Sequence, residues 1–140
     1  MIGCPATRHR AAMSRSCIRA GLLLTMSAVA SAAGAQSLNV LGQVGVLGEW
    51  ELTADLTATN TGGKEFSGPA LMRHVGLCTQ DGPEEKKGDL RIKLVRASQV
   101  DATLVVGGVT CTYQGRKDHN YSGTMRCPGQ RDVPLLLWLK

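Results

Sequence analysis

The feature that most constrains this 140-residue chain is a two-residue period of apolar side chains, which recurs along residues 49–139. In the segment 49–59, Trp50, Leu52 and Leu56 share one face, and mostly charged or hydroxyl side chains occupy the other. Such alternation is typical of a strand with one buried face. No stretch of helical length repeats its apolar residues every 3.6 positions. The pattern therefore predicts an all-β, antiparallel fold.

Segments rich in Gly, Asn, Pro and charged residues separate the other expected strands and favour turns. Besides the first strand and the hairpin described below, these strands occupy residues 70–78, 90–94, 102–106 and 133–139. In the earliest of them, Leu71, Val75 and Leu77 are expected to share the apolar, inner face, and Pro69 marks the start of the strand. The segment 80–88, QDGPEEKKG, is predicted to form a charged and exposed loop.

The best-specified element is a hairpin around His119. Cys111 and Tyr113 lie on the apolar face of its first strand, and Met125 and Cys127 lie on that of its second. The two apolar faces coincide if the turn is centred on residue 119, which pairs 113 with 125 and 111 with 127. Facing positions bring the two cysteines near disulfide range. This register predicts a cross-strand disulfide.

Residues 1–35 have the pattern of a cleavable export signal. Four arginines and no acid precede the short apolar run 20–33, and Ala33-Gly34-Ala35 fits an A-x-A cleavage site that leaves Gln36 first. Met13 is an alternative start for the same signal. The apolar run is shorter than the roughly 20 residues of a spanning helix, so no membrane insertion is expected after cleavage. We therefore expect a periplasmic or secreted protein.

Cleavage would also change the charge of the chain. The whole sequence has 16 Lys and Arg against 11 Asp and Glu, but four arginines and none of the acids lie in residues 1–35, which leaves 12 against 11. A nearly neutral domain gives no electrostatic reason to expect nucleic-acid binding. Three cysteines follow the signal, and an oxidising compartment lets them pair. Cys78 bonded to Cys111 or to Cys127 is the alternative to the predicted disulfide.

The 105 residues after the signal suffice for one domain. Residues 36–47 are predicted to be a flexible lead-in, and residues 48–140 a single β domain. Its expected architecture is an antiparallel meander, a barrel-like or strongly curved sheet of about six strands. The side chains expected to be mostly buried are Trp50, Leu52, Leu56, Leu90, Ile92, Leu94, Tyr113, Tyr121 and Met125.

Several short motifs point to a known family. Gly48-Glu49-Trp50-Glu51 opens the first strand, Cys78 ends the second, and Tyr121-Ser122-Gly123-Thr124-Met125 lies near the end. This order resembles the exported bacterial proteins grouped as domain of unknown function 3617, which show a G-x-W-E opening and a Y-x-G-x-M strand. The resemblance spans about residues 48–138 and implies an exported β domain without an established activity. Members often carry four cysteines, so their disulfide pattern is not carried over to this chain.

No catalytic, cofactor or metal motif stands out in the sequence. A zinc site would have to draw on His74, Cys78, Cys111, His119 and Cys127, which contain no close C-x-x-C pair. Cys78 and His74 are four positions apart, roughly 13 Å along a strand, which is too far for a nucleophile and its base. We therefore expect no enzyme, no catalytic residue, no cofactor and no metal.

The expected function is a non-enzymatic binding or interaction module of the cell envelope. Its partner would be a small apolar ligand, held in the open end or interior of the sheet, or an envelope protein. The alternative is an inhibitor of a cell-envelope hydrolase that acts through the loop 80–88. An apolar cavity would favour the first function, and a filled core with a protruding ordered loop the second.

Overall fold

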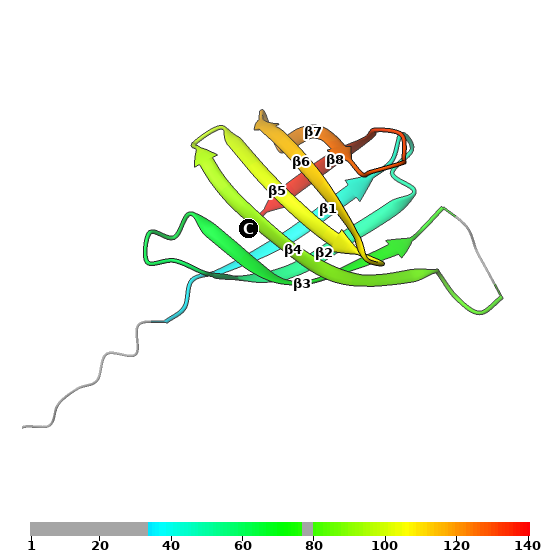
Figure 1. The fold of residues 1–140 in the computed structure, drawn as a ribbon, viewed down its shortest axis with the longest axis horizontal. Helices are drawn as coiled ribbons and strands as arrows, with labels where there is room; N and C mark the ends of the chain where they lie inside the picture. The colour runs from blue at the N-terminus through cyan, green and yellow to red at the C-terminus, as the bar shows by residue number, and fades with distance from the viewer. Residues whose placement is uncertain (1–33, 77–79) are drawn as a thin grey trace, which may run out of the picture. The chain divides into compact units, whose positions relative to one another are not determined.

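Each strand pairs with the next one along the chain in the computed structural model, which describes residues 34–76 and 80–140 (Figure 1). The eight strands are β1 (Ser37–Val44), β2 (Trp50–Ala58), β3 (Glu65–His74), β4 (Glu85–Arg96), β5 (Gln99–Val106), β6 (Val109–Lys117), β7 (Tyr121–Arg126) and β8 (Val133–Leu139). All pairs are antiparallel, and β1 also pairs with β8. The predicted all-β meander is confirmed, and it is a closed barrel of eight strands where about six were expected.

The strand β1 lies within residues 36–47, where a flexible lead-in was predicted, and this prediction is corrected here. Val40 and Val44 point into the barrel, and Gly42 occupies the inward position between them. A Cβ on Gly42 would lie 2.9 Å from Leu137 Cδ2 and 3.1 Å from Leu52 Cβ, so the neighbouring strands pack over the glycine. An inward glycine and an outward leucine, Leu41, conceal the alternation of this strand in the sequence.

Inward side chains from all eight strands fill the barrel. The largest fully buried side chains are Leu52, Leu56, Ile92, Leu137, Val40 and Val100, and no polar or charged residue is buried in the described part of the chain. Seven of the nine predicted core residues are buried. The other two, Trp50 and Leu94, are half-buried and pack against the edge of the core, because each lies near an end of its strand.

The inner face of β3 differs from the prediction by one residue. Phe66, Ala70 and Met72 point inward, whereas Leu71 faces outward and Val75 lies beyond the strand with 51% of its surface exposed. Leu77 lies outside the described residues, and Pro69, predicted to mark the start of the strand, lies inside it. The β2–β3 ladder is interrupted there, because proline has no N–H to donate.

The predicted loop 80–88 is shorter in the structure, because β4 begins at Glu85. The last pair between β4 and β5 joins Gly88 to Val106, so three residues of β4 extend beyond β5 and pair with β3 alone. Figure 1 shows the β3–β4 hairpin extending past its neighbours at the right of the view.

Two hairpins hold the register of β5, β6 and β7. Gly107 and Gly108 join β5 to β6 with φ angles of 58° and 76°, which suit a two-residue turn and are adopted readily only by glycine. The predicted register of the next hairpin is confirmed, since Tyr113 faces Met125. This register places the predicted cysteine pair at one end of the barrel.

We expect Leu56→Ala to lower the free energy of unfolding by about 2–5 kcal/mol, because it removes a fully buried side chain from a filled interior. The outward neighbour Asp55 is exposed, and Asp55→Ala should change the stability by less than about 0.5 kcal/mol. Denaturant unfolding of both variants measures the difference. Equal losses would show that β2 does not present its even-numbered residues to the core.

Candidate functional site

The barrel has one end at which β1, β3, β5 and β7 finish and the other strands begin, here called the mouth. A pocket of about 340 Å³ opens at the mouth, and we call it the mouth pocket. The side chains of Met72 and Met125 line it and are buried in the core. Four further strands each contribute one valine to the lining, namely Val44, Val106, Val109 and Val133, and Trp50 and the two cysteines also line it. The pocket is therefore a hollow above a filled interior.

A disulfide forms one wall of the mouth pocket. Cys111 and Cys127 are joined there with their Cα atoms 4.3 Å apart, one pair beyond the last ladder pair of β6 and β7. The predicted cross-strand pair is thus at disulfide distance. The alternative partner, Cys78, lies outside the described residues. The bond joins β6 to the residue after β7, just beyond the point where the β6–β7 ladder ends.

The opposite lip of the mouth carries an aromatic and basic cluster. Trp50 faces His74 across β2 and β3, and their ring centroids are 4.6 Å apart in an edge-to-face arrangement. Lys86 places its Nζ 4.6 Å from the centre of the Trp50 ring, within the range of a cation–π contact. The same Nζ lies 3.3 Å from Glu84 Oε1. The lip therefore offers one flat apolar surface and a cation beside it.

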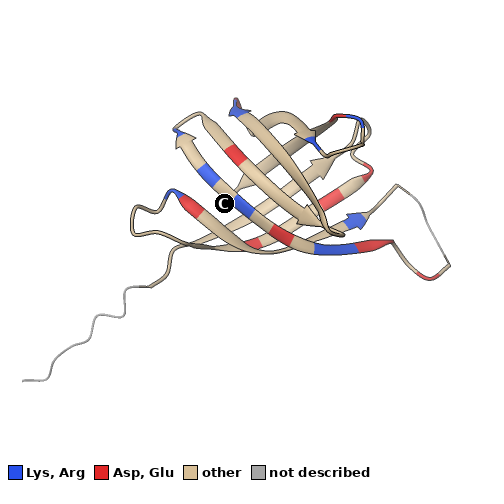
Figure 2. Cartoon of the chain, viewed as in Figure 1, with Lys and Arg blue, Asp and Glu red and all other residues tan. Residues whose placement is uncertain are grey.

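The other charges of the described chain lie mainly on exposed positions. Figure 2 shows acidic and basic residues along the length of β4. Ion pairs join Arg73 to Glu85 at 3.1 Å and Lys93 to Glu65 at 3.3 Å, with exposed side chains. Exposed pairs of this kind add about 0–1 kcal/mol each. Lys86 differs from these residues because it is the one charged side chain that lines the mouth pocket.

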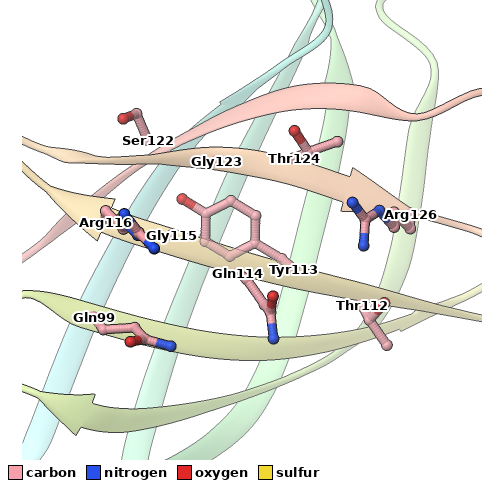
Figure 3. Close-up of a pocket in the computed structure, with 10 residues that line it drawn as sticks. All are labelled: Gln99, Thr112, Tyr113, Gln114, Gly115, Arg116, Ser122, Gly123, Thr124 and Arg126. Atoms are coloured by element: carbon pink, nitrogen blue, oxygen red, sulfur yellow. The ribbon is translucent and has the colours of Figure 1, made fainter.

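A second hollow, here called the outer hollow, lies on the outside of β6 and β7 (Figure 3). Gly115 and Gly123 face each other at its centre. A Cβ on Gly123 would collide with the backbone oxygen of Gln114, and one on Gly115 would collide with the hydroxyl of Tyr113. Both positions therefore require glycine, and the ring of Tyr113 covers this part of the wall from inside.

The outer hollow is larger than the mouth pocket, at about 640 Å³, but its lining is polar and open. Its outward side chains are Gln99, Thr112, Gln114, Arg116, Ser122, Thr124 and Arg126, all exposed or half-exposed. Arg126 is already paired with Asp132 at 3.1 Å. Binding sites for small ligands are mostly apolar and bury the ligand. The mouth pocket meets this description better, and we take it as the candidate site.

The histidines considered for a metal site do not come together in the structure. His119 lies in the turn between β6 and β7, at the end of the barrel opposite to His74. Within residues 34–76 and 80–140, no three His, Cys, Asp or Glu side chains are grouped to hold a metal. The same residues include no helix that is long and apolar enough to cross a membrane.

No protein-family model and no curated protein matches the chain. The resemblance to domain of unknown function 3617 therefore stays a prediction from the motifs. The interpretation of the site depends on its geometry alone.

The sequence did not indicate Lys86 or Met72 as site residues. Lys86 fell in a predicted exposed loop, and Met72 was assigned to the outer face of its strand. The inward series Lys86, Gly88, Leu90 and Ile92 on β4 was the available clue, because alternation from the core residues places Lys86 at the mouth.

Tyr113 makes the stability of the barrel sensitive to high pH. Its hydroxyl donates a buried hydrogen bond of 3.0 Å to the Tyr121 carbonyl. Burial raises the pKa of Tyr113 from 10.0 to about 12. Between these values the folded state keeps a proton that the unfolded chain has lost, so the free energy of unfolding should fall as the pH rises.

Denaturant unfolding of the wild type and of Tyr113→Phe at a series of alkaline pH values tests this expectation. The free energy of unfolding should fall less between pH 10 and 12 in the variant, because the variant lacks the hydroxyl whose pKa is raised by burial. Identical pH dependence in the two proteins would contradict the assignment.

Proposed function

We propose that the protein is a non-enzymatic binding module that holds a small apolar ligand in the mouth pocket. The observation that carries this proposal is an apolar hollow of about 340 Å³ at the open end of a closed barrel. This volume lies at the lower end of the range of about 300–1,000 Å³ for ligand pockets. The interior of an eight-stranded barrel is just wide enough for side chains to fill, as they do here, so the space for a ligand lies at the end of the barrel.

The filled interior limits how deeply a ligand enters. Leu52, Leu137 and Ile92 are completely buried below the mouth. No described polar or charged residue is buried there, and the buried hydroxyl of Tyr113 already donates a hydrogen bond to the Tyr121 carbonyl. A ligand would therefore rest on the core instead of replacing it. Its buried part would contact Met72 and Met125, whose flexible side chains adapt to different shapes.

The disulfide supports binding by keeping the pocket formed. Cys111 and Cys127 hold the ends of β6 and β7 together where the ladder has ended. A wall that is already in place costs little ordering entropy when a ligand binds. The neighbouring Gly107–Gly108 turn holds Val106 and Val109 on the same side of the pocket.

We also propose that the protein acts in the periplasm or outside the cell, after cleavage of residues 1–35. The cysteine pair at disulfide distance is consistent with an oxidising compartment. The predicted signal lies almost entirely outside the described residues. Intact-mass measurement of the exported protein tests this location. A mass that corresponds to a chain beginning at Gln36 would support it, and recovery of the uncleaved chain from a membrane fraction would contradict it.

The filled interior of the barrel and the extended β3–β4 hairpin support the alternative function, inhibition of an envelope hydrolase. The described stem of this hairpin, however, presents mainly charged side chains, with ion pairs between Arg73 and Glu85 and between Lys86 and Glu84. Tight protein interfaces centre on buried aromatic or apolar anchors. Binding of a small ligand in the mouth pocket is therefore the preferred function.

Titration with the neutral apolar dye N-phenyl-1-naphthylamine tests the proposed function. We expect saturable binding to the wild type and at least about tenfold weaker binding to Val109→Trp, because the indole would fill the pocket. The matched control is Thr110→Trp, since Thr110 is the outward, exposed neighbour on β6. Dye fluorescence at increasing protein concentration gives both affinities.

Equal weakening by the two variants would place the dye elsewhere. A wild type that does not bind the dye would contradict the proposed function. Thermal unfolding of each variant shows whether the barrel is still formed.

A further inference from the structure

We infer that the ligand of the mouth pocket is an amphiphile, an apolar chain that ends in an anionic group, and that Lys86 binds this group. The inference rests on the proposed function, because it names the class of ligand for the same pocket. It is carried by the position of Lys86, by the contacts of its Nζ and by the polarity of the lining.

Lys86 occupies an inward position on β4. It faces Met72 across the β3–β4 pair, and Met72 is a buried core residue that also lines the pocket. Because side chains alternate along a strand, Lys86 lies on the same face as Leu90 and Ile92. The cation is therefore directed over the mouth, in contrast to Lys87, which is turned outward.

The Nζ of Lys86 has contacts that a ligand can share or replace. It lies over the Trp50 ring and 3.3 Å from Glu84 Oε1. An ammonium group has three donors, so one carboxylate does not use its capacity. The side chains of Lys86 and Glu84 are 49% and 60% exposed, so their pair is weak. A ligand carboxylate would therefore compete with Glu84 at little cost.

The lining of the pocket sets the polarity of the ligand. Of the thirteen lining residues, Lys86 is the one with a charged side chain. Gln130 and the indole N–H of Trp50 are the uncharged side-chain groups able to donate hydrogen bonds. No carboxylate lines the pocket, so an anionic group meets no repulsion from the lining itself. An apolar chain would extend toward Met72 and Met125, with its charged end at the lip beside Trp50.

Calorimetric titration of the full chain with decanoate and with 1-decanol tests the inference, since the two probes share a chain and differ in charge. We expect the wild type to bind decanoate about fivefold more tightly than decanol. Lys86→Met should abolish this preference, so that the ratio of the two affinities falls to about one. The matched control Lys87→Met removes a charge from the outward neighbour and should keep the preference.

Glu84→Gln provides an independent arm of the test. It removes the competitor for the Lys86 ammonium, so decanoate should bind more tightly to this variant and decanol should bind as before. Lys86→Gln repeats the loss of charge with a polar side chain, in case the methionine variant does not fold.

The outcomes separate the inference from the proposed function. Equal affinity of the wild type for the two probes would overturn the anionic ligand and leave an apolar ligand in place. A preference for decanoate that survives in both Lys86 variants would overturn the role of Lys86. Binding of neither probe to the wild type would count against the proposed function itself.

Discussion

The pairing of β1 with β8 is the contact on which the rest of the structure depends. The ladder runs from Val40 facing Leu139 to Val44 facing Leu135. Beyond it, the backbones of Asn39 and Lys140 exchange two hydrogen bonds of 2.9 Å. Without this ladder the sheet would keep two unpaired edges, which invite association with other chains. Closure instead encloses the inward side chains on every side, so the domain buries one continuous core that is mainly aliphatic and includes Phe66, Tyr113 and Tyr121.

Closure also assembles the mouth from distant parts of the chain. Trp50, Lys86 and Val109 come from three different strands, yet all of them line one pocket. The disulfide between Cys111 and Cys127 then holds the wall opposite to the tryptophan. Rigid walls over a filled core explain why the apolar hollow is found at the end of the barrel and not in its centre. Because Lys86 is the one charged side chain in the lining, the pocket has an apolar floor and a positive charge at its lip.

The elements that could be predicted from the sequence are those whose pairing is determined by residues close together in the chain. The hairpin around His119 was predicted in the correct register because two alternating strands and one turn specify it completely. The strand β1 was missed, since Gly42 is inward for packing against Leu137, a residue nearly a hundred positions away. The inner face of β3 was misassigned because Leu71 is more apolar than Ala70, whereas the structure places Ala70 inward in line with Phe66 and Met72.

The candidate site was less predictable than the fold. The cysteine pair could be predicted because register determined it, whereas the approach of Lys86 to Trp50 depends on the pairing of β2, β3 and β4 across two connections. A charged run such as residues 84–87 is most often a solvated loop, and only the extension of β4 places one of its lysines on the inner face. Residues such as Lys86 can be assigned to a site only when the pairing of the whole sheet is known.

The central claim, that ligands bind at the mouth, is tested most directly by NMR of the protein labelled with ¹³C at its methionine methyl groups. Met72 and Met125 lie in the pocket and are the methionines of the described part of the chain. Titration with 1-decanol should shift both methyl signals in a saturable way and leave the amide signals of Gln114 and Ser122, in the outer hollow, in place. Unchanged methyl signals together with shifts in the outer hollow would contradict the account.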